Sequence, residues 1–490
     1  MYIYTTLFIV EALMVLTGFL LGLKRGAGKA IVRFVELIIA AIFSFLVAKW
    51  LSELLSDISL QTIKFEEPLG SIIESAPIAK ELVAGLAIAL VLPIIFTVIF
   101  LVIKAISLIG LSLLTRLLFG GKGGGLSNRL IGGAIGALTS LVVAVIVLCP
   151  FYTGTKILAN IPSETYDAFT SSLGMNEQDT ALFKSFFPEK DMTPPVSSLV
   201  VKAATNFSVE DKSYNATEEA PKLIDLAGDI MVSYGESKDA GESELMCISA
   251  AISASVAHLE DSEYVASLTT SLLNSIGESI KNGNDIFGLA NGMDGPLADV
   301  ILKSVGNILT GVTPENIAAN ISAIAGDGEN EGALTVLAEI TSAEDIKEVL
   351  KDSEQVDKLA NSLIAIAKNP ELSSTMDSLT EMGASVFTEA MPEEGSDERD
   401  EYIGKLSESV NDVLAATKET QSDFEGSVNT ATVIIQEKIA AESSTEITEG
   451  EAKLLAIYAL HHFGTTENYA DAENAPVSVE DIEALFGLNK

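Results

Sequence analysis

The residues with the clearest capacity for chemistry are two carboxylates inside apolar segments. Glu11 falls near the middle of the apolar run from Ile3 to Gly22. A charged side chain is costly in a hydrocarbon layer, so this carboxyl must be neutral, paired or directed into a polar cavity. Two interpretations follow: a proton or cation pathway, or a hydrogen-bonded contact between helices. Glu36 lies three residues after Arg33, and this spacing predicts a local ion pair.

Two loops match ligand-binding motifs only in part. The run from Asp327 to Gly332 has acids at calcium-loop positions 1, 3 and 5 and glycine at position 6, but Ala338 stands where a bidentate Glu is required. An acidic loop between helices is the favoured interpretation. Lys122 lies in a glycine run but is followed by glycine instead of Ser or Thr, which argues against a nucleotide site.

The remaining reactive residues predict no catalytic site. His461 and His462 point about 100° apart on a helix, so they do not bind one metal together. They precede Gly464 at the expected end of a helix, where a histidine interacts favourably with the negative end of the helix dipole. Neither a nucleophile elbow nor a zinc-protease motif is present. Cys149 and Cys247 are expected to be small apolar fillers. We therefore expect no enzyme, no metal and no cofactor.

Four apolar segments must position these residues. We expect membrane spans over residues 3–22, 30–50, 82–103 and 130–149, because about 20 helical residues at about 1.5 Å each cross the hydrocarbon layer. Lys104 is expected to mark the point where the third span leaves the membrane. The apolar remainder, 105–119, is too short to cross again and predicts a helix in the interface or packed on the spans.

Basic residues predict the orientation of these spans. Lys24, Arg25, Lys29 and Arg33 follow the first span, and Arg116, Lys122 and Arg129 lie between the third and the fourth. Because basic turns stay in the cytoplasm, the N-terminus and residues 151–490 are expected to be extracytoplasmic. The first span lacks a preceding basic region, so we expect it to be retained instead of cleaved as a signal peptide.

Glycines recur every four residues on two of the spans. They are Gly18, Gly22 and Gly26 on the first, and Gly132 and Gly136 on the last. A glycine face lets another helix approach closely, either within the chain or in a homo-oligomer. Flexibility of the turns near the interface is the other interpretation.

The two basic turns carry a family resemblance over about residues 1–155. The segments that carry it are Gly22-Leu23-Lys24-Arg25-Gly26 and the run from Leu126 to Leu138, which contains Asn128-Arg129. With the four-span order, they resemble the signatures of the colicin V production protein (CvpA) family. Thr139 and Ser140 stand where that family usually has a basic residue and glycine. The resemblance implies a cytoplasmic-membrane protein linked to production or export of a peptide toxin, and the family has no known catalytic activity to transfer.

The rest of the chain is strongly acidic. Residues 1–160 carry 12 basic and 8 acidic residues, whereas residues 161–490 carry 18 and 60. This charge excludes nucleic acid as a partner and leaves basic peptides, cations or cell-wall material as possible partners. The other interpretation is that the charge only keeps an exposed domain soluble. We expect a juxtamembrane connector over 156–220 and an acidic helical domain over 221–490. Helix starts are predicted at Thr313, Thr341, Asn369 and Thr448, and no strand is expected.

These observations favour an all-α protein with a four-span membrane domain and an acidic, all-helical extracytoplasmic domain. The leading functional hypothesis is a non-enzymatic membrane scaffold or assembly factor of the colicin V production type, which engages a protein or basic peptide partner. The alternative is a small channel or transporter for protons, ions or a small solute, with Glu11 and the glycine-faced helices along its pathway.

Overall fold

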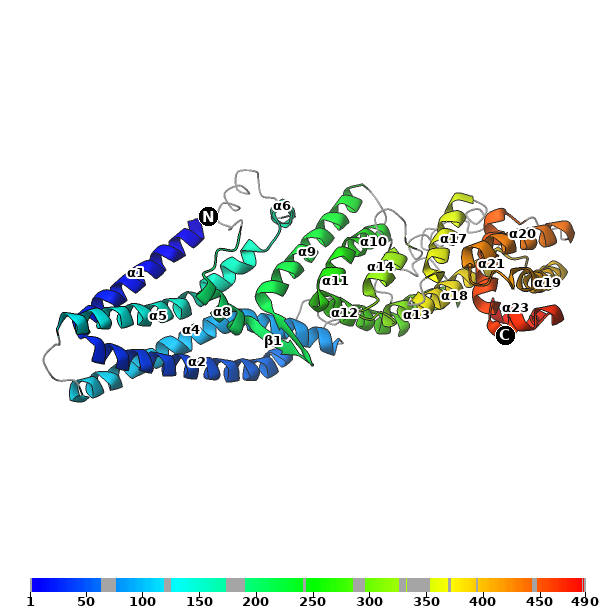
Figure 1. Ribbon diagram of the computed structural model, residues 1–490. Helices are drawn as coiled ribbons and strands as arrows, with labels where there is room; N and C mark the ends of the chain where they lie inside the picture. The colour runs from blue at the N-terminus through cyan, green and yellow to red at the C-terminus, as the bar shows by residue number, and fades with distance from the viewer. Residues whose placement is uncertain are drawn as a thin grey trace. The chain divides into compact units, whose positions relative to one another are not determined.

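The computed structural model describes most of the chain as helix (Figure 1). One two-stranded antiparallel sheet is the exception among the described residues. Contacts divide the chain into two compact units, Met1–Asp229 and Ile230–Lys490. The described residues are 2–62, 76–118, 125–172, 190–240, 244–284, 296–325, 332, 353–368, 372–393, 395–442, 447–486 and 488.

Among the described residues, four helices are long and apolar enough to cross a membrane. They are α1 (Tyr2–Arg25), α2 (Ala27–Thr62), α4 (Pro77–Leu118) and α5 (Leu126–Ala159). Their candidate spans are Ile3–Arg25, Ala27–Ser52, Pro77–Leu108 and Leu126–Ala159. The expectation of a membrane-embedded protein with four apolar helices is thus confirmed at the level of length and composition.

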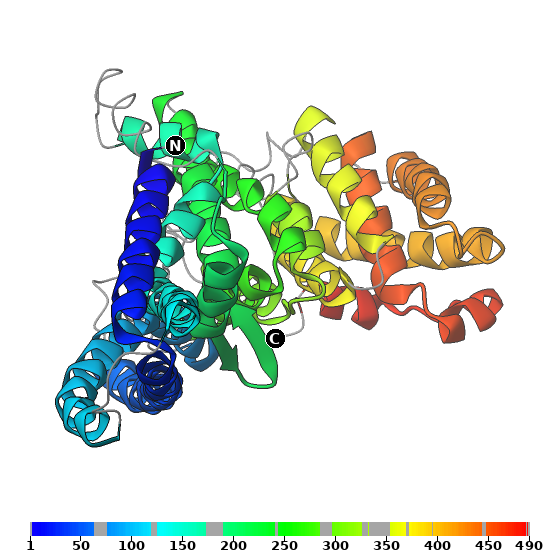
Figure 2. The ribbon, with the colours of Figure 1, turned by 60° about the vertical axis from the view of Figure 1, so that its left-hand side comes forward.

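The four helices pack as two pairs, α1 along α5 and α2 along α4, and α2 also contacts α5 (Figures 1 and 2). Small and aromatic residues such as Ala40, Ala48 and Phe100 are buried between α2 and α4. Large aliphatic residues such as Leu13 and Ile39 are instead exposed on the outer surface. This is the reverse of a water-soluble bundle and is typical of helices that face lipid.

One helix differs from its expected course. α4 continues without interruption to Leu118, so the expectation of a separate helix over 105–119 is wrong. Lys104, the expected point of exit from the membrane, lies within this helix and pairs with a carboxylate of α2, described below. Pro93 lies inside α4, and a helix within a packed unit tolerates it where neighbouring groups satisfy the freed carbonyl.

The segment after α5 folds onto the membrane helices. It contains α6 (Ser163–Ser172), α8 (Pro195–Thr205) and a hairpin of β1 (Asn206–Val209) and β2 (Lys212–Asn215). The strands correct the expectation that the chain has none. Four-residue strands are too short for period-two alternation to be recognised, and packing supports this hairpin: Phe207 lies so close to Gly85 of α4 that a Cβ there would be 2.7 Å from its ring.

Unit 2 begins within α9 (Ala216–Asp239) and is helical in all its described elements. These are α10 (Glu244–Ala254), α11 (Val256–Asp261), α12 (Glu263–Lys281), α13 (Pro296–Thr310), α14 (Ile317–Ala325), α17 (Ser353–Ala367), α18 (Ser373–Ala390), α19 (Asp397–Thr417), α20 (Phe424–Glu442), α21 (Glu449–Phe463), α22 (Thr466–Ala470), the 3-10 turn η2 (Ala472–Asn474) and α23 (Val479–Leu485).

The core of unit 2 forms around α21. Most of this helix is buried, and it packs against α17 and α20. Its start is a capping box: Thr448 accepts from the N–H of Glu451, and the Glu451 carboxylate accepts from the N–H of Thr448. This confirms one predicted helix start. α14 begins at Ile317, after the predicted Thr313, whereas the starts at Thr341 and Asn369 lie outside the described residues.

Candidate functional site

The carboxylate of Glu11 lies at the contact between α1 and α5. The Tyr152 hydroxyl, which is fully buried, donates a hydrogen bond to Glu11 Oε2 at 2.7 Å. A hydroxyl donor stabilises a carboxylate without adding a second charge, so the pair lowers the cost of a polar group in an apolar setting. Of the two interpretations of Glu11, the hydrogen-bonded helix contact is therefore the one that this geometry supports directly.

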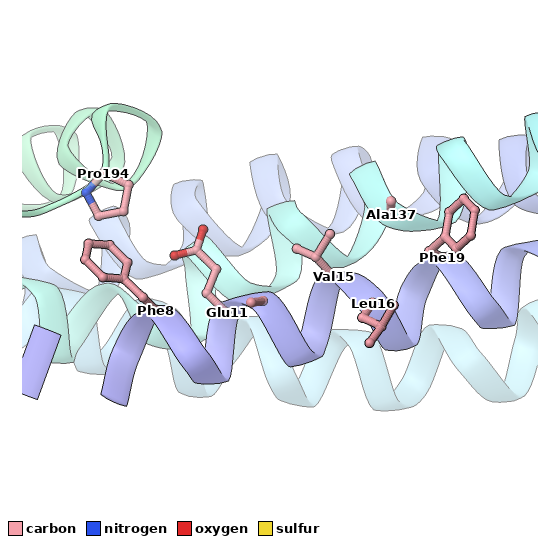
Figure 3. Close-up of a pocket in the computed structure, with 8 residues that line it drawn as sticks. Phe8, Glu11, Val15, Leu16, Phe19, Ala137 and Pro194 are labelled. Atoms are coloured by element: carbon pink, nitrogen blue, oxygen red, sulfur yellow. The ribbon is translucent and has the colours of Figure 1, made fainter. Parts of the chain in front are cut away.

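Glu11 also lines a cavity along α1. The cavity measures about 580 Å³, and its other walls are apolar. Figure 3 shows the Glu11 carboxylate on α1 between Phe8 and Val15, with Pro194 beside Phe8. A mostly apolar cavity with one carboxylate at its wall is able to bind an apolar group, or a proton or cation at its single acidic position. The lining residues are Phe8, Glu11, Ala12, Val15, Leu16, Phe19, Ala137 and Pro194.

A second polar contact joins the start of α1 to the segment before α8. The hydroxyl of Tyr4 donates to Asp191 Oδ1 at 2.8 Å, and the N–H of Thr193 donates to the same oxygen at 2.9 Å. Burial acts to raise the pKa of the Asp191 carboxyl, but hydrogen bonds from Thr193 and Tyr4 and the nearby charge of Lys156 outweigh it, so this pKa lies below its usual value. Asp191 is therefore held in its charged form at this end of unit 1.

The predicted Arg33–Glu36 ion pair is replaced by a contact between helices. Lys104 of α4 lies 2.6 Å from Glu36 Oε2, and Ser107 donates to Glu36 Oε1. Both charged side chains are mostly buried, at 13% and 18% exposure for Glu36 and Lys104. A lysine on a neighbouring helix satisfies the carboxylate, and the arginine one turn away is not needed. Glu11 and Glu36 thus each have a partner from another helix.

The glycine faces of α1 and α5 pack against each other within one chain. A Cβ on Gly132 would lie 2.6 Å from the carbonyl carbon of Gly26 and 2.7 Å from the carbonyl oxygen of Gly22. A Cβ on Gly136 would lie 2.8 Å from the Gly22 Cα and closer still to the Gly18 carbonyl oxygen. Only glycine allows this approach of two backbones, so the intrachain alternative accounts for the repeat.

The two turns that carry the family resemblance meet in space. Asn128 Oδ1 accepts a hydrogen bond from the N–H of Ala27 at 3.0 Å, just after Gly26 turns the chain at φ +78°. Lys24 and Arg25 form the last turn of α1, and Arg129 lies in the first turn of α5. The two basic turns therefore lie at the same end of unit 1, as a shared side of the membrane requires.

The other candidate residues of the sequence are the calcium-like loop, Lys122 and the two adjacent histidines. The calcium-like loop lies outside the described residues apart from Gly332, as does Lys122. His461 Nε2 lies 2.7 Å from Asp377 Oδ1, while burial and the adjacent His461 lower the pKa of His462, so its protonation is disfavoured despite the helix end. Within the described ranges, no group of three or more His, Cys, Asp or Glu could hold a metal.

Sequence reasoning missed the partners of the site. Tyr152 lies beyond the expected end of the last span at Cys149, whereas α5 continues through Pro150 to Ala159. A tyrosine shortly after an apolar run, in a chain with one unpaired intramembrane acid, is the signal that would have found it. The sequence favours Lys104 as the point where the third span leaves the membrane, whereas the structure gives it to Glu36 as a counter-ion.

Comparison with protein-family models, with curated proteins and with solved structures gives no match. The resemblance to the colicin V production family therefore rests on the two motifs and the four-span order alone.

Proposed function

We propose that this chain is a non-enzymatic integral membrane scaffold or assembly factor, with its acidic helical part extracytoplasmic and available to a protein or basic peptide partner. The observation that carries the proposal is the pairing of its intramembrane polar groups. Glu11 is bound by Tyr152, and Glu36 by Lys104 and Ser107. Hydrogen bonds and ion pairs between side chains of different helices fix the positions of the helices. A membrane anchor requires such a fixed arrangement.

The glycine contacts support the same proposal. Gly132 and Gly136 bring the α5 backbone against α1 at a distance that excludes any side chain. Such a contact leaves no passage between this helix pair and favours a fixed arrangement. The colicin V production resemblance adds the process, production or export of a peptide toxin in the cytoplasmic membrane. Because the glycines are used within the chain, a homo-oligomer would require a different surface.

The second candidate function is a small channel or transporter for protons, ions or a small solute. The observation in its favour is the cavity that Glu11 lines. An acidic group at the wall of an open cavity is a common element of proton and cation pathways. The two proposals differ in whether Glu11 must change its protonation or ligand during function.

Flux measurements separate the two proposals. Full-length protein and a Glu11→Gln variant are reconstituted into vesicles that contain a pH-sensitive dye, and a pH step or a potassium gradient is applied. The scaffold proposal expects both proteins to behave as empty vesicles. In parallel, a photo-cross-linker at exposed Asn429 in cells should give one discrete adduct, unchanged by Glu11→Gln. Flux above the empty-vesicle rate that Glu11→Gln abolishes would refute the scaffold and support transport.

A further inference from the structure

The helix α8 has two apolar faces, of which one is occupied. Its buried residues include Ser197, Val201 and Ala204, at the three- and four-residue spacing of one helix face. Val201 and Ala204 share a buried cluster with Tyr4 and Leu7 of α1 and with α5 residues around Cys149. α8 is therefore packed directly on two of the candidate membrane spans.

The opposite face of α8 is exposed and also apolar. Leu199 is 71% exposed and Val196, three residues earlier, is 54% exposed. Met192, in the segment leading into the helix, is 51% exposed. From Met192 to Val201 the ten residues carry no charge. A short helix on a soluble surface would present polar residues here, whereas an apolar outer face is typical of a helix in contact with lipid.

The depth of α8 follows from its neighbours. Pro194, its N-terminal neighbour, lines the cavity with Phe8 and Glu11 of α1 (Figure 3). Val200 packs against the buried cluster between α2 and α4 that contains Phe96 and Ile146. These contacts all fall within candidate spans. Phe151 of α5, close to the Cys149 that α8 covers, is 61% exposed, so the end of α5 also presents an apolar side chain on its outer side.

Charged groups of the segment lie at its two ends. Asp191 is bound by Tyr4 and Thr193 before the helix, and Lys202 lies 3.6 Å from Glu218 near its end. Charges that flank an apolar stretch and pair with their own unit keep the stretch itself free for an apolar environment.

We propose that α8 is an interfacial membrane helix, and that Met192, Val196 and Leu199 enter the acyl-chain region of the leaflet beside the start of α1 and the end of α5. The occupant of the exposed face is lipid, since the buried face of α8 packs on residues that lie within the candidate spans. α8 thereby becomes a fifth membrane-contacting element, which ties the chain beyond the last span to the bilayer surface. The proposal holds whether unit 1 is a scaffold or a transporter.

Tryptophan fluorescence tests the position of this face. The single tryptophan, Trp50, is replaced by Phe, and Leu199→Trp is introduced in full-length protein reconstituted into phosphatidylcholine vesicles. Vesicles with acyl chains brominated near the headgroup should remove most of the emission, while aqueous iodide should have little effect. Glu419→Trp, at an exposed position of unit 2, is the matched control and should respond to iodide but not to bromolipid.

Each other outcome overturns the proposal. Quenching of Leu199→Trp by iodide alone means that the face is in water. Protection from both quenchers means that protein covers it, and cross-linked dimers from a Leu199→Cys variant would identify a second copy as the cover. Met192→Trp provides an independent reading if Leu199→Trp does not fold, because Met192 precedes the helix and its replacement leaves α8 intact.

Discussion

Adding one methyl group to Gly132 is expected to destabilise unit 1, although alanine favours helices. The added Cβ would lie 2.6 Å from the Gly26 carbonyl carbon, 2.7 Å from the Gly22 carbonyl oxygen and 2.8 Å from the Gly26 Cα. All three atoms belong to backbone, so no flexible side chain can move aside. The helices α1 and α5 must therefore separate along their shared glycine face.

The magnitude follows from the size of that separation. Ordinary contact begins at 3.4 Å, so the backbones must part locally by about 0.8 Å. A gap of about 0.5–1 Å forfeits a quarter to a half of the dispersion energy of the atoms concerned. Overpacking of this kind costs about 1–3 kcal/mol, which for a unit of this size lowers the thermal midpoint by about 2–12 °C.

Gly154→Ala is the matched control on the same helix. A Cβ on Gly154 meets no atom within 4 Å, so this substitution adds only helix propensity. Its free energy of unfolding should be unchanged or increase by up to about 1 kcal/mol. Gly132→Ala is thus expected to lower the stability of unit 1, whereas Gly154→Ala is not.

The chain contains its own reporter for this measurement. Cys149 of α5 is fully buried and becomes accessible to a thiol reagent only when unit 1 opens. Protein in detergent is heated in the presence of a fluorogenic maleimide, and peptide mapping distinguishes labelling of Cys149 from that of Cys247 in unit 2. An equal or higher Cys149 labelling midpoint for Gly132→Ala than for Gly154→Ala would refute the close-packing argument.

Two further predictions use the same protein. Lys104→Met should destabilise unit 1 by about 3–5 kcal/mol because it leaves Glu36 buried without a counter-ion. Adding Glu36→Gln to this variant should recover most of the lost stability in the Cys149 assay. If the effects of the two single substitutions simply add in the double variant, the ion pair is contradicted. The second prediction concerns the orientation of the chain in the membrane. A membrane-impermeant maleimide on intact cells should label Asn429→Cys, but it should label Ser127→Cys, beside the basic turns, only after lysis. The reverse labelling pattern would show that the proposed topology is inverted.

Much of the fold could be predicted because it is encoded locally. An apolar run of about 20 residues is a helix in a membrane whatever its neighbours are, since lipid offers its backbone no hydrogen bonds. The capping box at Thr448 is equally local, because both of its hydrogen bonds close within three residues. The β-hairpin was missed for the opposite reason: Phe207 packs on Gly85, a residue far away in the chain.

For the candidate site, the sequence predicts which residues need a partner but not which residue the partner is. Glu11 was singled out because a carboxyl in an apolar segment requires a partner, and the glycine spacing required a close neighbour. Neither requirement names the neighbour. For Glu36 the nearest cation in the sequence, Arg33, was the wrong choice, since the partner that the fold supplies is Lys104.

By itself, the amino-acid sequence determined which segments are apolar helices, where the acidic residues accumulate and which intramembrane groups need a partner, because these properties depend on residue type and short-range spacing. Only the tertiary structure decided that Tyr152 binds Glu11, that Lys104 binds Glu36 and that α8 lies against the spans. The first two contacts join residues 141 and 68 positions apart, and at such separations only the packing of whole helices selects which side chains meet.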